Sequence, residues 1–422
     1  MYKITYSDFN EMGFPVSSIN PKNIRLYHNG GGVIPVVNKE KRHDDLVEIP
    51  IYVHGETDGS FDESDYVLFY ARGPVTWKYN NGAYERVPNP YSDYSCVFLT
   101  ADKGEGKRIQ NAAAISDNHD EVVTSFLDYQ LKEDDIYNLN NMGATWYFDK
   151  YDVVTSLSYQ FDFPDIIKDR KCYLRAEVAS KNNVPASFKF KANGVQISQL
   201  NFSKINSSNT FALTSGTGNV KFSSNKNNVD INLEYVKSGS SSSGWVDYIS
   251  VNAWRKLKFY GNAMLFRNPE CVDNEKIYRY EIENASNSMQ VWDVTNPVEP
   301  KKMPLQFSSD VASFLTEGVE NNEFVAFNGK EFKKPNFISV VNNQNLHSRY
   351  DFDYLIITHP NFVSQAERLK EIHSRIDDLE IEIVTTPQIY NEFSCGALDI
   401  AAIRDYIKMI YDKSDERLRY VL

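Results

Sequence analysis

Apolar and polar residues alternate with a period of two along most of this chain, which predicts a mainly β protein. Turn residues separate the alternating segments at short intervals, a spacing typical of β-sandwiches. The clearest segments are Leu46–Val53, Asp65–Tyr70, Ser156–Phe163, Cys172–Val178 and Val229–Tyr235. We therefore expect a multidomain protein whose larger part consists of β-sandwich or jelly-roll-like domains.

The alternating segments fall into three groups. Residues 1–110 form a first β-sandwich-like domain, in which Ile24–Tyr27 and Val33–Val37 are expected strands. Residues 111–145 are irregular and acidic, and we interpret them as a connection. Residues 146–265 form a jelly-roll-like domain, and residues 266–348 a small third β domain.

The pattern changes near residue 349, where strands and helices begin to alternate. Asp353–Thr358 is a continuous apolar run, typical of a parallel strand buried on both faces. Asn361–Ser374 has the apolar spacing of an amphipathic helix, and Glu380–Thr385 resembles a second strand. The order strand, helix, strand predicts an α/β sheet.

A short turn is expected after this second strand, followed by a helix from Asp399, its N-cap, to Tyr411. Arg419–Leu422 then enters a third strand, so we expect the remaining strands, and the chemistry they support, to follow Leu422. The third strand would expose an unpaired apolar edge. We therefore expect this segment to be poorly ordered, or covered by the β domains or by a second copy of the chain.

Composition excludes some classes of function. The 422 residues carry a net charge of −12 and show no basic stripe, which argues against a nucleic-acid scaffold. No apolar run is long enough for a membrane helix. No basic and apolar leader precedes the first strand, so the protein is either cytoplasmic or has lost a signal peptide.

The cysteines and the acidic residues give little sign of a metal site. Cys96, Cys172, Cys271 and Cys395 are widely spaced, so neither a structural zinc site nor a disulfide framework is expected. Glu56, Asp58, Asp62 and Asp65 surround glycine turns and could offer oxygen ligands to calcium. Their spacing is not that of an EF-hand, and a solvated turn explains them equally well. No cofactor is predicted.

Two further groups of residues could carry function. Trp245 and Trp254 could stack on sugars, but both lie within strand patterns, where large aromatic residues usually fill a core. Cys395 could be a nucleophile with His359 or His373 as its base. The turn around Cys395 is equally an ordinary helix start, and His373 suits the last turn of a helix.

The α/β segment resembles a known family. Asp353–Pro360, Val384–Phe393, Gly396–Ile407 and Leu418–Leu422 follow one another as in the opening of the peptidase domain of gingipain-family cysteine peptidases. They are most similar to the sortase-like peptidases of the Bacteroidetes type IX secretion system. The resemblance implies a caspase-like fold whose catalytic His and Cys match no residue of this chain. We therefore name no catalytic, cofactor or metal residue, and expect the chain itself to be inactive.

The resemblance also implies partners and a location. The substrates would be secreted cargo proteins, from which a carboxy-terminal secretion domain is removed on the outer surface of the outer membrane. Other secretion-system components would be partners, nucleic acid would not, and self-association could occur through the open sheet edge. The alternative is a binding or structural module of a surface complex, for glycans or proteins, with no peptidase activity. The gene sequence after Leu422 and a glycan array would distinguish the two hypotheses.

Overall fold

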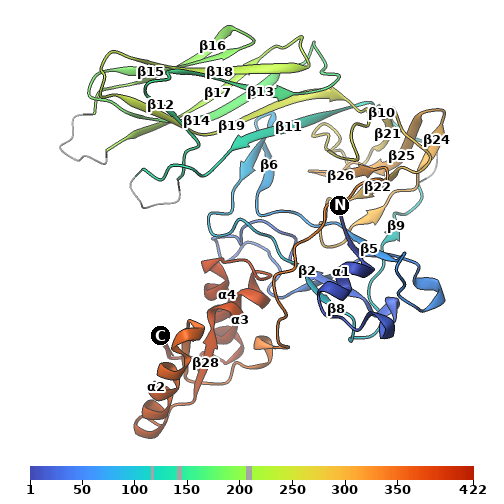
Figure 1. Ribbon diagram of the computed structural model, residues 1–422, viewed down its shortest axis with the longest axis vertical. Coiled ribbons are helices and arrows are strands. Elements are labelled where there is room, and N and C mark those ends of the chain that lie inside the picture. Colours follow the sequence, from blue (N-terminus) through green and yellow to red (C-terminus); the bar gives the residue numbers. More distant parts are fainter. Residues whose placement is uncertain (116–117, 140–144, 206–211) are drawn as a thin grey trace.

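The computed structural model describes residues 1–115, 118–139, 145–205 and 212–422. Its fold is mainly β with a carboxy-terminal α/β segment, as the hydrophobic pattern predicts. Figure 1 shows the jelly roll at one end of the molecule and the α/β segment at the other. The first β domain lies between them. Short 3₁₀ helices occur as η1 (Val16–Ser18), η2 (Pro21–Asn23), η3 (Glu56–Asp58), η4 (Leu346–Ser348) and η5 (Pro360–Phe362).

In the first β domain two three-stranded sheets, β1-β5-β4 and β3-β2-β8, share one apolar core. The strands are β1 (Tyr2–Thr5), β2 (Arg25–His28), β3 (Val47–Ile49), β4 (Tyr52–His54), β5 (Tyr66–Phe69) and β8 (Phe98–Thr100). Helix α1 (Tyr6–Glu11) begins at Thr5, whose hydroxyl accepts the Asp8 N–H at 3.3 Å. The predicted strand Val33–Val37 is absent, because this stretch crosses to the α/β segment.

A long hairpin joins the first β domain to the jelly roll. It consists of β6 (Thr76–Asn80) and β7 (Ala83–Val87), paired antiparallel around the turn Asn81–Gly82. Both turn residues have positive φ, as a tight hairpin requires. Figure 1 shows β6 rising from the first β domain to the jelly-roll sheet.

The jelly roll has two antiparallel sheets, β11-β19-β14-β17 and β13-β18-β15-β16, with β12 added to β19. Its strands are β11 (Ser125–Glu133), β12 (Asp149–Tyr151), β13 (Ser156–Asp162), β14 (Cys172–Lys181), β15 (Ala186–Ala192), β16 (Val195–Phe202), β17 (Thr214–Phe222), β18 (Asn228–Lys237) and β19 (Ser243–Lys256). Aromatic side chains such as Phe161, Phe188 and Phe190 fill the space between the sheets. This arrangement agrees with the alternation in the sequence.

Residues 111–145, predicted to be irregular, include the strands β10 and β11 in their described part. β10 (Glu121–Val123) pairs in parallel with a strand of the third domain, and β11 pairs with β19 over nine residues. The alternation is hidden here because Phe126 and Leu127 are neighbours and both are buried, each in a different core. The acidic run Glu133–Asp135 only marks where β11 ends.

The third β domain encloses its own core between two sheets, β10-β21-β25-β24 and β20-β26-β22-β23-β9. Its remaining strands are β9 (Gln110–Asn111), β20 (Ala263–Phe266), β21 (Ile277–Ile282), β22 (Gln290–Asp293), β23 (Lys301–Lys302), β24 (Gln306–Ser308), β25 (Val311–Glu317) and β26 (Phe324–Phe327). Tyr280, Phe266 and Phe314 pack ring against ring in this core.

The α/β segment is a three-layer unit. Parallel strands β27 (Tyr354–Thr358), β28 (Ile381–Thr385) and β29 (Tyr420–Val421) form a sheet in the order β28-β27-β29. Ile356 packs with Ala366 of helix α2 (Val363–Ile376) on one face of the sheet. Leu355 packs on the other face with helices α3 (Thr386–Phe393) and α4 (Ile400–Lys413). Burial on both faces explains the continuous apolar run in β27.

Most elements of this segment agree with the sequence prediction, with one error. Asp399 caps α4 as expected, accepting the Ala401 N–H at 2.8 Å. The turn expected after β28 is instead helix α3, whose first turn is held by Gln388, which accepts the Thr385 N–H at 2.9 Å. The outer edge of β29 has no neighbouring strand in the described residues, and its Tyr420 and Val421 are half exposed.

Candidate functional site

The first β domain holds the α/β segment through residues 29–46, which we call the strap. Ile34 of the strap lies in the core formed by β27, α3 and α4. Its N–H donates to Oδ2 of Asp399 at 3.0 Å, while Oδ1 of the same carboxylate caps α4. The strap is thus part of the α/β core on the side of α3 and α4. The expectation that the open edge of β29 is covered stays a prediction.

An arginine pair fixes the strap along α4. Nε and Nη2 of Arg42 donate to the two carboxylate oxygens of Asp405 at 2.6 and 2.7 Å. Arg404, the neighbour of Asp405, donates to the Pro35 carbonyl at 2.8 Å. Bidentate guanidinium–carboxylate pairs are among the strongest polar contacts in proteins. Because Asp405 is buried, the pair also fixes the register of the strap on the helix.

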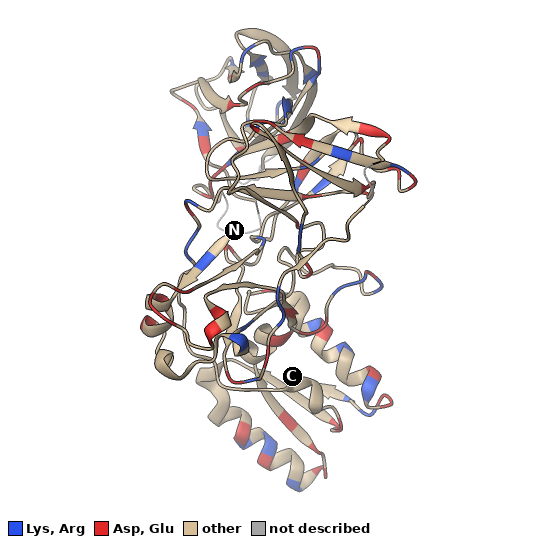
Figure 2. Cartoon of the chain, turned by 90° about the vertical axis from the view of Figure 1, so that its right-hand side faces the viewer, with Lys and Arg blue, Asp and Glu red and all other residues tan. Residues whose placement is uncertain are grey.

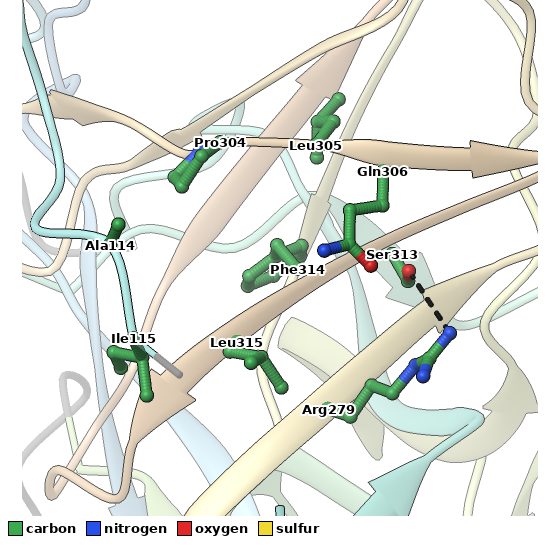
Figure 3. A pocket seen from close by; sticks show the side chains of 9 residues that line it. All are labelled: Ala114, Ile115, Arg279, Pro304, Leu305, Gln306, Ser313, Phe314 and Leu315. Atoms are coloured by element: carbon green, nitrogen blue, oxygen red, sulfur yellow. Dashed lines mark hydrogen bonds between the residues drawn. The ribbon is translucent and has the colours of Figure 1, made fainter. Parts of the chain in front are cut away.

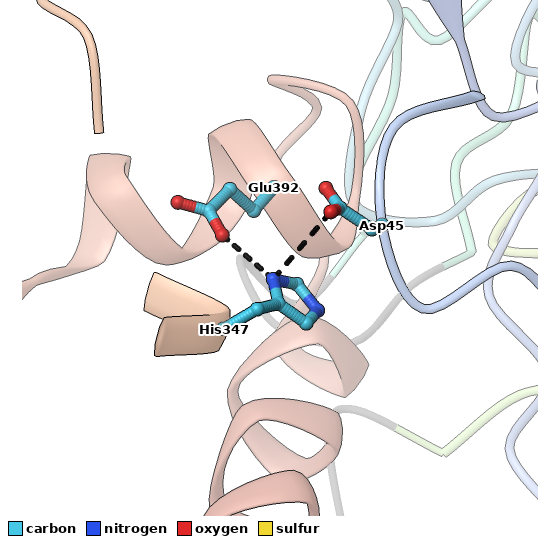
Figure 4. Close-up of side chains that lie close together, drawn as sticks. All are labelled: Asp45, His347 and Glu392. Carbon is cyan, nitrogen blue, oxygen red and sulfur yellow. Dashed lines mark hydrogen bonds and ion pairs between the residues drawn. The ribbon is translucent and has the colours of Figure 1, made fainter. Parts of the chain in front are cut away.

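A second ionic cluster joins the end of the strap to α3 (Figure 4). Nδ1 of His347 lies 2.7 Å from Oε2 of Glu392 and 3.7 Å from Oδ2 of Asp45. Its Nε2 lies 3.0 Å from the Asp44 carbonyl. Both ring nitrogens therefore face oxygen acceptors, and only the doubly protonated imidazolium can donate to both. The hydrogen bond to Glu392 and the charges of Asp45 and Glu392 raise the pKa of His347.

Glu392 is the centre of this cluster. Its carboxylate is 7% exposed and accepts hydrogen bonds from the Leu346 N–H at 2.8 Å and from the Gln344 amide at 2.8 Å. Burial acts to raise its pKa, but the donors from His347, Gln344 and Leu346 outweigh burial and lower it. Asp45, His347 and Glu392 have the side-chain types of a cation site. Since N–H groups already point at the Glu392 oxygens, we interpret the cluster as an ion pair.

The cluster should make the attachment of the α/β segment dependent on pH. The folded-state pKa of His347 is raised above its usual 6.5, so its contribution is complete below that value and is lost as pH rises through the raised pKa. We expect faster hydrogen exchange at the Leu346 amide at about pH 9 than at about pH 6, after correction for intrinsic rates. In His347→Gln the corrected exchange rate of the Leu346 amide should be the same at both pH values. If the variant shows the same increase with pH, another group causes the effect.

Cys395 meets a histidine other than the two predicted. Its Sγ lies 3.7 Å from Nδ1 of His28 and 3.1 Å from the Cys96 carbonyl. Cys395 is 1% exposed and burial raises the pKa of its thiol, while burial lowers the pKa of His28 to about 4. Both groups are therefore neutral near pH 7, and a buried neutral pair is not an activated nucleophile.

The two predicted bases are engaged elsewhere. His359 accepts the Asn361 N–H at 3.2 Å at the start of η5, and His373 lies 2.7 Å from Asp377, one turn further along the chain. The pairing of Cys395 with either of them was wrong. His28 could not have been found from the sequence, because it lies 367 residues from Cys395 and carries no motif.

The carboxylates of the acidic loop accept hydrogen bonds from separate donors. Glu56 pairs with Arg108 at 2.6 Å, and Asp58 accepts the Ser60 N–H at 3.0 Å. Asp65 is buried and accepts the Asp62 N–H at 2.8 Å. Glu56, Asp58 and Asp65 each accept from a different donor, which favours the turn interpretation over a shared cation site.

The two tryptophans are core residues. Trp245 is 6% and Trp254 is 4% exposed, and Arg170 stacks over the Trp254 ring at 3.4 Å from the ring centre. A sugar platform needs an open ring face, so neither residue can serve as one in this conformation.

The hollows in the described part of the β domains include two with mixed polar and apolar linings. One, of about 130 Å³, lies in the third domain, where Arg279 donates to Ser313 at 3.4 Å beside apolar residues such as Leu305 and Phe314 (Figure 3). The other, of about 280 Å³, lies between the β6–β7 hairpin and the jelly roll and is lined by residues including Tyr173 and Asn219. Neither lining contains a cysteine or a histidine, so neither offers the groups of a cysteine peptidase.

The surface charge does not suggest a nucleic-acid interface. In Figure 2 basic and acidic residues are interspersed over the described chain, and no extended basic stripe is visible. Among the helices of the described ranges, none has both the length and the hydrophobicity of a membrane span.

Comparison with known proteins identifies a class. Residues 347–422, which include His347, Glu392 and the α/β segment, match the family model described as Peptidase family C25. These are the gingipain-type cysteine peptidases, so the segment carries the sequence features of that family. A comparison with curated proteins returns no match.

A solved structure shows a likeness in fold over nearly the whole chain. The chain superposes on dimeric latent PorU from Porphyromonas gingivalis with a TM-score of 0.83 and 22% identity. The match covers 98% of this chain and 39% of that one, so the chain is PorU-like in fold but spans about two fifths of the PorU length. A carbohydrate-binding module, CBM36 with calcium and xylotriose, aligns over 23% of this chain and 71% of that one, with 19% identity. Its TM-score of 0.18 is too low to support an inference.

Proposed function

We propose that this chain forms the non-catalytic amino-terminal part of a gingipain-family cysteine peptidase that acts as the sortase of a type IX secretion system. The whole enzyme would remove carboxy-terminal secretion domains from cargo proteins at the cell surface. The main support is the coincidence of two findings. The family match at residues 347–422 falls on a three-layer α/β unit, and the PorU-like fold extends over 98% of the chain.

In this proposal the β domains act as a platform for the peptidase domain. The strap contributes Ile34 to the core beneath β27 and holds α4 through Arg42. The sheet edge that would receive further peptidase strands, at β29, stays open on the side away from β27. Among the described residues, Cys395 is the cysteine whose thiol contacts a histidine, and it is too buried to reach a substrate. We therefore assign catalysis to residues outside this chain.

A pair of proteins tests the proposal: the 422-residue chain and the same chain extended by any residues that its gene encodes after Leu422. Both are incubated with a cargo protein carrying a carboxy-terminal secretion domain, before and after limited proteolytic activation. We expect no cleavage by the shorter chain, and cleavage by the longer one that iodoacetamide abolishes, because the nucleophile is a thiolate.

Two outcomes would contradict the proposal. One is thiol-dependent cleavage by the 422-residue chain, for which Cys395→Ala is the control that shows whether this thiol is responsible. The other is a stop codon directly after Leu422, or an extended chain that remains inactive toward cargo after activation.

A further inference from the structure

Cys96 and Cys395 lie against each other at the junction of the first β domain and the α/β segment, although 299 residues separate them. Sγ of Cys395 is 3.1 Å from the carbonyl oxygen of Cys96. The Cys96 side chain points at the same turn, because a Cβ placed on Gly396 would lie 3.4 Å from its Cβ and 3.6 Å from its Sγ. Gly396 follows Cys395 directly, and neighbouring Cα atoms are about 3.8 Å apart. The side chains of Cys96 and Cys395 therefore lie close together at this turn.

Contacts with neighbouring residues keep Cys96 and Cys395 close together. The Cys96 carbonyl lies 2.9 Å from Nδ1 of the buried His28, so the ring and the Cys395 thiol both donate to it. Cys395 has a φ of +52°, a left-handed conformation that is uncommon for residues other than glycine. Such a conformation persists when the contacts around it fix the backbone. Cys96 itself precedes β8 and is in no strand, so its side chain can rotate without breaking a sheet.

We propose that Cys96 and Cys395 form a reversible disulfide that covalently locks the first β domain to the α/β segment. A disulfide requires Cβ atoms about 3.5–4.5 Å apart. The contacts of both cysteines at the Cys395–Gly396 turn already bring the two side chains together. Both cysteines are thiols in the structure, so the bond is a modification of the state described above. The proposal is independent of the proposed peptidase function.

Cys96 is more exposed than Cys395, so we expect Cys96 to react first. Cys96 is partly exposed, so its thiolate attacks a low-molecular-weight disulfide such as oxidised glutathione and releases one glutathione thiolate. The Cys395 thiol then loses its proton, its sulfur attacks the Cys96 sulfur of the mixed disulfide, and the second glutathione leaves. Two cysteine thiols are oxidised, one glutathione disulfide is reduced, and the two cysteine protons end on the two glutathione thiols.

Thiol counting and peptide mapping test the proposal on the full chain. The reduced protein is equilibrated with excess oxidised glutathione, trapped with N-ethylmaleimide under denaturing conditions, and digested. We expect the four free thiols to fall to two, and the peptides containing Cys96 and Cys395 to be joined. The denatured oxidised chain should also run faster on a non-reducing gel, because the bond closes most of the chain into a loop, and dithiothreitol should reverse this shift.

Two variants serve as controls. Cys96→Ser, at a partly exposed position, should abolish the joined peptide and the gel shift. Cys172→Ala, at a cysteine buried in the jelly roll, should leave both unchanged. The proposal is overturned if four thiols remain after equilibration, if glutathione stays attached to Cys96 without linkage, or if the joined peptides contain a different pair.

Discussion

Glu392→Ala is expected to destabilise the α/β segment by about 3–5 kcal/mol, the usual cost of removing one partner from a buried ion pair. The variant leaves the His347 imidazolium without its nearest carboxylate and the Leu346 N–H without an acceptor. Hydrogen exchange measured segment by segment should show the loss. Because each 1.4 kcal/mol is about a factor of ten, we expect amides in α3 and β27 to exchange roughly 100-fold faster or more.

Glu371→Ala is the matched control, since Glu371 is an exposed glutamate on α2. Its effect should lie within about 0.5 kcal/mol, as for most surface substitutions. The destabilisation by Glu392→Gln should lie between the effects of Glu392→Ala and Glu371→Ala. The amide oxygen can still accept the Leu346 N–H, but it carries no charge to pair with His347. If the exchange rates of Glu392→Ala equal those of Glu371→Ala, the cluster does not hold the segment.

Asn252→Ala should release the β6–β7 hairpin from the jelly roll. The Asn252 side chain accepts the Tyr84 N–H at 2.7 Å and donates to the Tyr84 carbonyl at 3.0 Å, and it is buried. Alanine would leave both backbone groups unpaired at about 1–3 kcal/mol each. The direct measurement is exchange of the Tyr84 amide, which should accelerate about 100-fold.

The iodide quenching of Trp77 should report the same release. Its ring packs against Tyr129 of the jelly roll with centroids 3.9 Å apart, so detachment of the hairpin would expose the indole. Asn201→Ala, at an exposed asparagine of β16, is the control and should change neither the Tyr84 exchange nor the quenching. Unchanged exchange in Asn252→Ala would mean that side-chain packing alone holds the hairpin.

The sequence predicted those elements whose signals are local. The apolar run of β27 indicated a strand buried on both faces, and Leu355 and Ile356 do pack on opposite helical layers. Asp399 was recognised as an N-cap because capping depends on residues within one turn. Helix α3 was mistaken for a turn even though Thr385 and Gln388 carry the spacing of a capping box, a signal that short helices give only weakly.

The junction could not be predicted, because its partners are distant in the chain. Arg42 and Asp405 are 363 residues apart, and no local signal in the sequence pairs them. His347 lies in a short 3₁₀ helix that no periodicity marks. Polar residues of this kind acquire a role only when tertiary folding brings their partners to them. The family resemblance indicated what the segment is but not how the β domains hold it.

The position of Ile34 has a consequence for synthesis on the ribosome. The side chain belongs to the core under β27, yet it leaves the exit tunnel more than 300 residues before that strand. The α/β core therefore depends on contacts of very long sequence separation, which slow folding. While the residues between the strap and the α/β segment are synthesised, the earlier domains fold first and the strap stays without its partners. We expect chaperone binding to nascent chains to be strongest just before α4 emerges, and to weaken once the helix has captured the strap.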